Sequence, residues 1–281
     1  MKYSIWSNYL IRTEPEEMVV TLARKGWHYS ELSTEHGEQL LGRGDPANTG
    51  AEFKKFADRY GVKFPQGHLW LQVDIACEKQ AEMVDILKRW IDLYYAAGVK
   101  NCVLHAGGRE MRNNGCTAEE INKANARALK ILCDYIGDRD IRICIENMAG
   151  GYKTAVEIKE LISMVNSPKM AICLDTGHLN MCGFSQSEFI AEAGSLLKAV
   201  HITDNEGKSD QHLIPYARGR VDWEDFITAL AKSPYEGLLN FEIPGETISC
   251  PYELILAKLD YVREVASYMI SKIDNIRNCK I

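Results

Sequence analysis

The segments Ile141-Arg142-Ile143-Cys144-Ile145-Glu146-Asn147 and Met170-Ala171-Ile172-Cys173-Leu174-Asp175-Thr176-Gly177-His178 follow the same pattern. Each is a short apolar run that ends in a carboxylate. Near-continuous apolar runs are typical of parallel strands that are covered on both faces, because neither face of such a strand meets water. We therefore interpret both segments as buried parallel strands with an acidic residue at the C-terminal end.

The same kind of apolar run recurs along the whole chain and alternates with amphipathic helical patterns. The predicted strands are Tyr3 to Ser7, Trp27 to Leu32, Phe64 to Trp70, Val99 to His105, Ile141 to Glu146, Met170 to Asp175, Ala199 to Thr203 and Leu238 to Glu242. Helical patterns include Glu16 to Lys25, Glu78 to Ala97, Ala118 to Tyr135, Ala155 to Val165 with Thr154 as its N-cap, and a last helix from Tyr252 to Ile270.

This alternation predicts an α/β fold, a single (β/α)8 TIM barrel that takes up residues 1–281 as one domain. No linker rich in proline, glycine or serine divides the chain. An open, doubly wound sheet is the alternative, but no Gly-x-Gly-x-x-Gly motif follows the first strand and no phosphate-loop motif occurs.

The composition favours small-molecule chemistry. Of 281 residues, 46% are hydrophobic and 26% are charged, as in ordinary globular proteins. The net charge of −6 argues against a broad basic surface, so nucleic acid is an unlikely partner. Nine scattered cysteines indicate a reducing compartment, and no apolar stretch has the length of a signal peptide or a membrane span. We expect a cytoplasmic protein that does not contact a membrane.

Polar residues stand where the predicted strands end, and four of them suggest a metal site: Glu146, Asp175, His201 and Glu242. In a parallel barrel all strand C-termini meet at one mouth, which is where barrel enzymes work. Three carboxylates at that mouth would raise one another's pKa unless a cation joined them. A single strand-end glutamate is more often a helix cap or a surface ion-pair partner, but four such residues in this order favour a divalent metal such as manganese, magnesium or zinc.

The histidines are distributed in the same way. Five of the seven lie at or just after a predicted strand end, namely His68, His105, His178, His201 and His212. Asp210 precedes His212 by two positions, a spacing that in an extended chain puts both side chains on one side. We interpret His36 as a loop residue and His28 as a strand residue of undetermined facing, and assign neither a role.

Together these motifs resemble the xylose isomerase-like barrel superfamily, which contains sugar and sugar-phosphate isomerases and epimerases as well as the endonuclease IV group. The resemblance spans the barrel. Its carriers are His105-Ala106-Gly107, Glu146-Asn147, Leu174-Asp175-Thr176-Gly177-His178, Val200-His201-Ile202-Thr203-Asp204, Asp210-Gln211-His212-Leu213-Ile214-Pro215, Arg218-Gly219, Val221-Asp222-Trp223 and Phe241-Glu242.

The resemblance to the ketose epimerase branch implies that Glu146, Asp175, His201 and Glu242 bind Mn²⁺ or Zn²⁺, or else Mg²⁺ or Co²⁺. The two glutamates would then act as an acid/base pair on a sugar, sugar phosphate or cyclitol. One removes a proton next to the carbonyl to give a metal-stabilised enediolate, and the other returns it in an epimerisation or isomerisation. His178 would be a polarising group, and Trp6, Trp70 and Arg218 would line the substrate pocket.

The endonuclease IV branch is the alternative, and implies a multinuclear zinc phosphodiesterase. Its zinc ligands would match His68, His105, Glu146, Asp175, His178, His201, Asp210, His212 and Glu242. We rank it second because the chain is acidic and has no evident basic loops bearing aromatic residues to hold a bent duplex. A barrel that only binds a sugar or metal is a third hypothesis, which the pair of glutamates disfavours.

Two departures from the epimerase pattern weaken that assignment in its narrow sense. Ala217 stands where a glycine is common, and Asp210 and His212 stand where the epimerases have an arginine. We expect specificity to come from loops at 35–48 and 107–117. Arg43, Arg109 and Arg112 are candidates there for binding a phosphate or carboxylate, although loop arginines are more commonly only solvated. A homo-oligomer is compatible with the sequence.

Overall fold

The computed structural model describes residues 1–279, and its eight strands form a closed parallel barrel in the order β1 to β8. Each strand pairs in parallel with the next, and β8 pairs with β1 to close the ring. The strands are β1 (Lys2–Trp6), β2 (Tyr29–Leu32), β3 (Lys63–His68), β4 (Asn101–Leu104), β5 (Arg142–Glu146), β6 (Met170–Asp175), β7 (Leu197–Ile202) and β8 (Leu238–Phe241). The predicted TIM barrel is confirmed.

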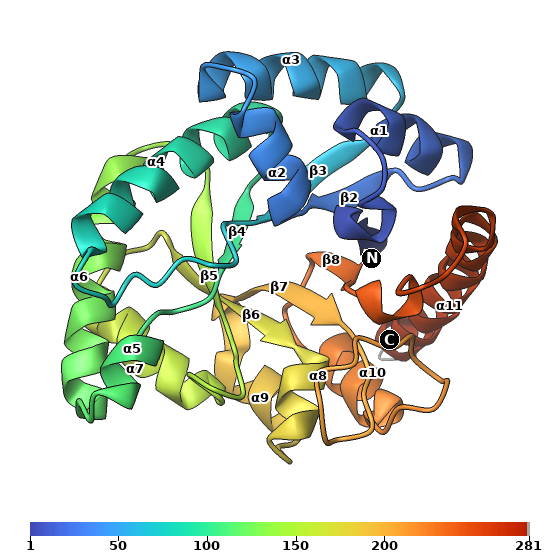
Figure 1. Ribbon diagram of the computed structural model, residues 1–281. Coiled ribbons are helices and arrows are strands. Elements are labelled where there is room, and N and C mark those ends of the chain that lie inside the picture. The colour runs from blue at the N-terminus through green and yellow to red at the C-terminus, as the bar shows by residue number, and fades with distance from the viewer. Residues whose placement is uncertain (280–281) are drawn as a thin grey trace.

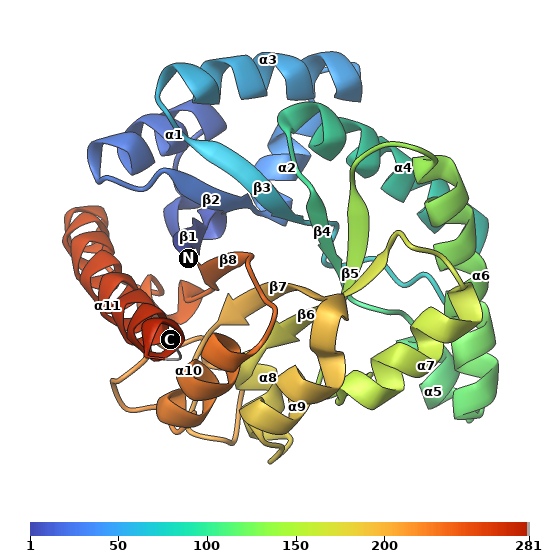
Figure 2. The ribbon, with the colours of Figure 1, turned by 180° about the vertical axis from the view of Figure 1, so that it is seen from behind.

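Helices surround the barrel on its outer side, as Figures 1 and 2 show from opposite directions. They are α1 (Pro15–Arg24), α2 (Thr34–Leu41), α3 (Pro46–Arg59), α4 (Gln80–Ala97), α5 (Arg109–Asn113), α6 (Ala118–Ile136), α7 (Ala155–Val165), α8 (Thr176–Met181), α9 (Gln186–Ala193), α10 (Trp223–Lys232) and α11 (Tyr252–Asn278). Short 3-10 turns are η1 (Ser7–Leu10), η2 (Gly194–Leu196) and η3 (Pro244–Glu246). None of the helices among residues 1–279 is long and apolar enough to cross a membrane.

Local capping explains several helix starts. The Thr154 side chain accepts a hydrogen bond from the backbone N–H of Glu157, and the Glu157 carboxylate accepts one from the Thr154 N–H. This reciprocal capping box confirms the predicted N-cap and satisfies donors that the first turn of α7 leaves free. At its other end, α4 stops at Gly98, whose φ of 93° is the left-handed conformation that glycine adopts without strain.

The predicted loop at 35–48 is wrong, because it contains most of α2 and the start of α3. Ser33 caps α2, and Asp45 caps α3 with Pro46 in its first turn. His36 therefore lies in a helix, and its buried ring contacts the Ser7 hydroxyl at 2.9 Å and the Thr13 carbonyl at 3.1 Å. Short polar helices such as α2 have a weak apolar pattern, which is why the sequence did not reveal them.

Two apolar layers result from the alternation of side chains along the strands. Outward-facing residues such as Ile143 and Ile145 join the large core between the sheet and the helices. Inward-facing residues below the mouth form a second, separate cluster of small side chains: Val103, Cys144, Ala171, Cys173 and Ala199. On β5, β6 and β7 the next inward-facing positions toward the mouth are Glu146, Asp175 and His201, so the fold of these strands places three of the predicted metal ligands in one layer.

Candidate metal centre

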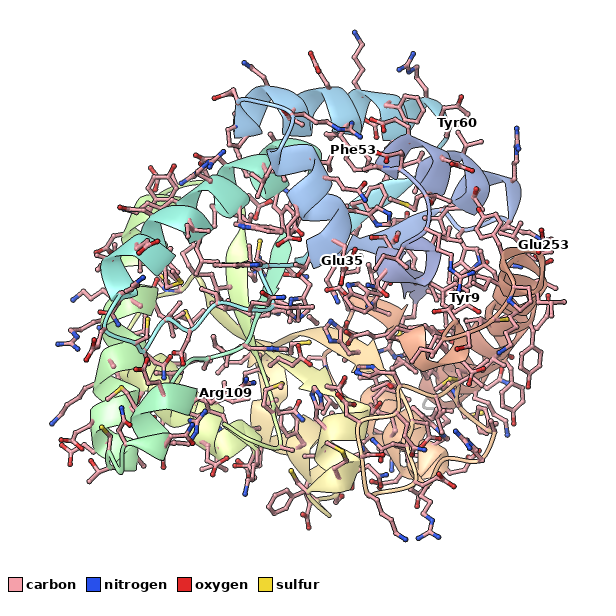
Figure 3. The ribbon with its side chains drawn as sticks, in the orientation of Figure 1. Tyr9, Glu35, Phe53, Tyr60, Arg109 and Glu253 are labelled. Carbon is pink, nitrogen blue, oxygen red and sulfur yellow. The ribbon has the colours of Figure 1, made fainter. Side chains whose placement is uncertain are left out.

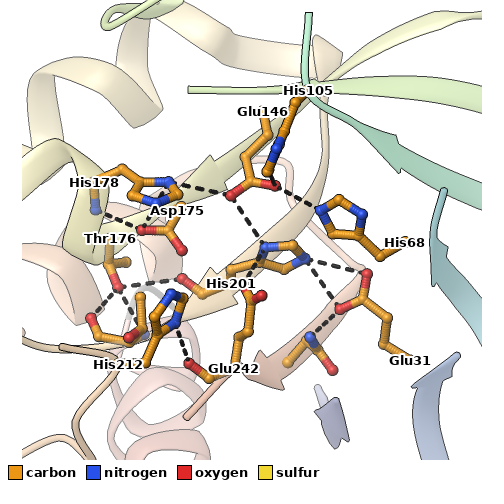
Figure 4. A network of polar contacts seen from close by, with 12 residues as sticks. Glu31, His68, His105, Glu146, Asp175, Thr176, His178, His201, His212 and Glu242 are labelled. Carbon is orange, nitrogen blue, oxygen red and sulfur yellow. Dashed lines mark hydrogen bonds and ion pairs between the residues drawn. The ribbon is translucent and has the colours of Figure 1, made fainter. Parts of the chain in front are cut away.

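Every strand contributes a side chain to the inner wall of the barrel at or near its C-terminal end. The residues are Trp6, Glu31, His68, His105, Glu146, Asp175, His201 and Glu242. Side chains alternate between the two faces of a strand, so residues two positions apart point to the same face. The inward-facing position nearest the mouth on each strand therefore belongs to this wall. Figure 4 shows how the polar members of this layer converge.

The four residues predicted as metal ligands lie together. One donor atom from each of Glu146, Asp175, His201 and Glu242 falls within 4.8 Å of the donor atoms of the other three. The four side chains are buried, with exposed fractions between 0% for Asp175 and 5% for Glu242. Since buried charges need partners, this arrangement is costly for the protein alone.

The electrostatics of the group call for a cation. Burial raises the pKa of Asp175 to about 7, and the charges of Glu146 and Glu242 act in the same direction. Asp175 Oδ2, His201 Nδ1 and Glu242 Oε2 are buried and have no hydrogen-bond partner in the described part of the chain. His201 Nδ1 lies 2.7 Å from Glu242 Oε2, but the two atoms are not aligned for a hydrogen bond. Donors that face one point without satisfying each other fit a divalent cation between them.

His68 and His105 lie on one side of this group. Their Nε2 atoms are 3.3 Å and 3.2 Å from Glu146 Oε2, and the three residues form a second set of possible ligands. His68 Nδ1 lies 2.8 Å from the Leu69 carbonyl oxygen, which only an N–H can satisfy. In the neutral form of His68, the lone pair of Nε2 would therefore face the Glu146 carboxylate. Burial opposes protonation of His68, but Glu146 outweighs it and raises the pKa, so a proton or a cation fits between the two groups.

His178, Asp210 and His212 form a third set on the other side. Asp210 Oδ2 is 3.1 Å from His178 Nε2 and 3.0 Å from His212 Nε2. Although burial opposes protonation of His212, Asp210 and Glu242 outweigh it and raise its pKa to about 9. The backbone is not extended at this point, because His212 has φ of 48°. The two side chains nevertheless meet, as expected.

The three residues predicted to line the substrate pocket differ in their surroundings. Trp6 is buried at the end of β1, with its ring centroid 6.5 Å from that of His68. Trp70 is half-buried and packs against the outer core. Arg218 is exposed in the long loop after β7. A substrate-lining role for these residues stays a prediction, and the position of Trp70 favours core packing.

Sequence reasoning missed Glu31. This carboxylate is fully buried on β2, and its two oxygens lie 3.2 Å and 3.0 Å from His201 Nε2. The Asn240 side-chain amide also donates to Glu31. With Nε2–H donating to Glu31, His201 Nδ1 is left to face Glu146 and Glu242, the geometry of a carboxylate that orients a metal-binding histidine. Its position inside a predicted buried strand, where a charged residue is unusual, is the feature of the sequence that could have identified Glu31.

Metal binding should depend on pH through Asp175. A cation needs the ionised carboxylate, and with a pKa of about 7 the group is mostly protonated at lower pH. We expect the affinity for Mn²⁺ to rise between about pH 6 and about pH 8, by up to about tenfold per pH unit below the pKa. Isothermal titration calorimetry of metal-free protein measures this.

The Asp175→Asn variant provides the control for that titration. Asparagine caps a helix as well as aspartate does, so α8 keeps its N-cap while the negative charge is lost. Affinity for Mn²⁺ should fall by at least about 100-fold. Asp138→Asn, an exposed site, should bind like wild type. Equal binding by wild type and Asp175→Asn would contradict the assignment.

Replacing Glu31 tests whether it orients His201. Glu31→Gln keeps the shape of the side chain but removes its charge, so we expect Mn²⁺ to bind about 10–100-fold more weakly. Glu38→Gln, an exposed site on α2, serves as the matched control. Melting temperatures of the metal-free proteins separate a loss of folding from a loss of affinity. A variant that is destabilised but binds Mn²⁺ normally would show that Glu31 is only structural.

Comparisons with known proteins show which family the chain belongs to. The xylose isomerase-like TIM barrel family matches residues 20–271. An L-ribulose 3-epimerase of Methylomonas sp. (strain DH-1) is 29% identical over 257 residues, 85% of this chain and 81% of that protein. A probable endonuclease 4 of Mycoplasma pneumoniae is 27% identical over 192 residues, 62% of this chain and 64% of that protein.

Other matches bear mainly on the fold. Uncharacterized protein y4fM of Sinorhizobium fredii is 30% identical over 168 residues, 57% of this chain, and the chain spans only 52% of that relative. A crystal structure of D-psicose 3-epimerase with D-fructose superposes with a TM-score of 0.80 at 17% identity, covering 96% of this chain and 99% of that one. Since the family match covers most of the barrel, this chain belongs to the xylose isomerase-like TIM barrel family.

Proposed function

We propose that this protein is a metal-dependent carbohydrate epimerase or isomerase that moves a proton at a carbon next to a carbonyl group. The observation that carries the proposal is a pair of buried glutamates on either side of one histidine. His201 Nδ1 lies 3.4 Å from Glu146 Oε1 and 2.7 Å from Glu242 Oε2. Two carboxylates at one site can act as proton acceptor and proton donor in turn.

The cation would be held by the four-residue group around His201. Three carboxylates and one imidazole suit manganese, magnesium or zinc. A bound divalent cation supplies polarisation of the substrate carbonyl and stabilises the negative charge of an enediolate.

Both glutamates are ionised at neutral pH, which is the form that a general base needs. Burial opposes ionisation of Glu146, but His201 and His105 outweigh it and hold its pKa well below the ordinary value. The pKa of Glu242 is lowered against burial by His201. Both side chains are therefore carboxylates at neutral pH. One carboxylate removes the substrate proton and later releases it to solvent. The other first takes up a proton from solvent, and then delivers it either to the opposite face of the same carbon, which epimerises it, or to the neighbouring carbon, which isomerises the sugar.

In this proposal His178 assists as a polarising group. Its Nδ1 lies 3.3 Å from Glu146 Oε1 and 3.0 Å from the Asn147 carbonyl oxygen. Burial lowers the pKa of His178, but Asp175 and then Asp210 outweigh burial and raise it well above the ordinary value. An imidazolium beside Glu146 helps to keep that carboxylate ionised and offers a positive charge to a substrate oxygen.

Exchange of substrate hydrogen with solvent tests the proposal. Protein loaded with Mn²⁺ should incorporate deuterium from D₂O into one member of a panel of ketoses, inososes and their phosphates, as read by NMR. Glu146→Gln and Glu242→Gln should slow exchange by about 10²–10⁴-fold at saturating Mn²⁺, the usual contribution of a general acid or base.

Glu236→Gln, at an exposed site, is the matched control and should exchange like wild type. Metal content is measured for each variant, because both glutamates are also proposed ligands. Exchange that persists at the wild-type rate in both variants would rule out the glutamate pair as the proton carriers.

A second candidate, phosphodiester hydrolysis by several metal ions, is favoured by one observation. The sets containing His68 with His105 and His178 with Asp210 flank the central group, so the mouth offers three adjoining sets of donors. The net charge of −6 disfavours a nucleic acid substrate.

An abasic-site oligonucleotide separates the two functions. We expect no cleavage by protein loaded with either Mn²⁺ or Zn²⁺, because an acidic protein gains little from binding a polyanion. Zinc content is measured on the same samples. Two or three zinc ions per chain together with metal-dependent cleavage would replace the epimerase proposal with the hydrolase.

A further inference from the structure

A cavity of about 340 Å³ adjoins the proposed metal centre on the side of β4. The loops that follow β3, β4 and β5 form it, and its lining includes His105, Asp74, Arg109, Arg112, Met148 and Gly150. His105 belongs both to the cavity and to the donor set around Glu146, since its Nε2 is 3.2 Å from Glu146 Oε2. The His105 side chain is 21% exposed while that of Glu146 is 1% exposed, so the cavity gives solvent-side access to the buried group.

Arg109 and Arg112 give this cavity a positive charge. Figure 3 shows Arg109 on α5, on the face of the barrel that is turned toward the viewer in Figure 1. Within residues 1–279, neither guanidinium forms an ion pair with a carboxylate, in contrast to Arg43. Arg43, the third arginine singled out in the sequence, instead pairs with Glu16 at 2.6 Å. Of the three loop arginines, two remain free for a ligand.

Asp74 is the acidic residue in the cavity wall, and its carboxylate is hydrogen-bonded to the backbone. It accepts hydrogen bonds from the backbone N–H groups of Ala76 at 2.9 Å, Gly108 at 2.8 Å and Arg109 at 3.1 Å. These bonds tie the loop after β3 to the loop after β4. The carboxylate therefore fixes the backbone that carries Arg109. It keeps its negative charge, so two guanidinium groups and one carboxylate leave the cavity wall with a net positive charge.

A second tether makes the same loop rigid. The buried Asn125 side chain accepts a hydrogen bond from the Gly107 N–H at 2.8 Å and donates one to the Gly107 carbonyl at 3.1 Å. A Cβ added at Gly107 would lie 2.2 Å from Asp74 Oδ1, so the close contact between the two loops requires glycine. A preorganised loop loses little entropy when a ligand binds.

We propose that this cavity binds an anionic group of the substrate through Arg109 and Arg112, while the carbonyl end of the substrate reaches the metal centre past His105. The substrate would thus be a sugar that carries a phosphate or a carboxylate, the two groups whose geometry matches the fork of a guanidinium. This inference deepens the proposed function and rests on it for the carbonyl end. Binding of the anion is measurable without turnover.

The test compares three probes with metal-free protein at constant ionic strength: D-ribulose 5-phosphate, D-galacturonate and neutral D-ribulose. Isothermal titration calorimetry should show at least one anionic probe binding about 10–100-fold more tightly than D-ribulose, the range for hydrogen bonds to charged groups. Whichever of the two anionic probes gains affinity identifies phosphate or carboxylate as the group recognised.

The Arg109→Ala/Arg112→Ala double variant should lose this advantage and bind D-ribulose as wild type does. Both residues are exposed, so the fold should be retained, and circular dichroism verifies it. Arg127→Ala removes another exposed arginine, on α6, and should bind all three probes normally. Equal affinity of wild type for all three probes, or an advantage that survives in the double variant, would overturn the proposal.

The outcomes also separate this inference from the epimerase proposal. Arginine-dependent anion binding without deuterium exchange on any sugar would support the anion subsite and count against the proposed reaction. Exchange on neutral sugars at the same rate in wild type and in the double variant, with no anion advantage in binding, would support the reaction and remove the subsite.

Discussion

Mutual repulsion among three buried carboxylates is the constraint on which the mouth of this barrel depends. Glu146, Asp175 and Glu242 place donor atoms within 4.8 Å of one another and of His201. Buried charges of one sign cannot all persist without compensation. Imidazoles provide part of it, and the pKa of Asp175, raised to about 7, shows that they do not provide all. Either a proton or a divalent cation can relieve the remaining repulsion.

The barrel can hold such a group because its parallel strands form a rigid support from below. Small side chains such as Ala171 and Cys173 fill the interior beneath the acidic layer. Every second residue continues the same wall toward the mouth, so Ala171 and Cys173 lead to Asp175 on β6. The chain directions fix the carboxylates relative to one another, and strained loops are not needed to bring them together.

This regularity explains how much could be predicted from the sequence. The strand pattern was sufficient to predict the barrel and the convergence of the residues at the ends of β5 to β8. In a parallel barrel all strands end at the same mouth, so the positions of these residues have little freedom. Glu31 was not predicted, because its proposed role depends on His201, a partner 170 positions away, and not on any local motif. The helix α2 and the position of His36 in it were not predicted, because the local apolar pattern is weak. Tertiary packing, in which the His36 ring contacts Ser7, decides the structure there.

The loops divide the surroundings of the site into two unlike sides. On one side, the exposed Asp210 carboxylate lies against the imidazoles of His178 and His212, so its charge is balanced within the protein. On the other, the Asp74 carboxylate is bound by backbone N–H groups, while Arg109 and Arg112 give the cavity wall a net positive charge. The proposed anion subsite lies on this second side. A substrate with one charged end would therefore enter in one orientation, and its uncharged carbonyl end would be directed to the glutamates. In this proposal, specificity comes from how each loop binds its own acidic residue, which no strand pattern encodes.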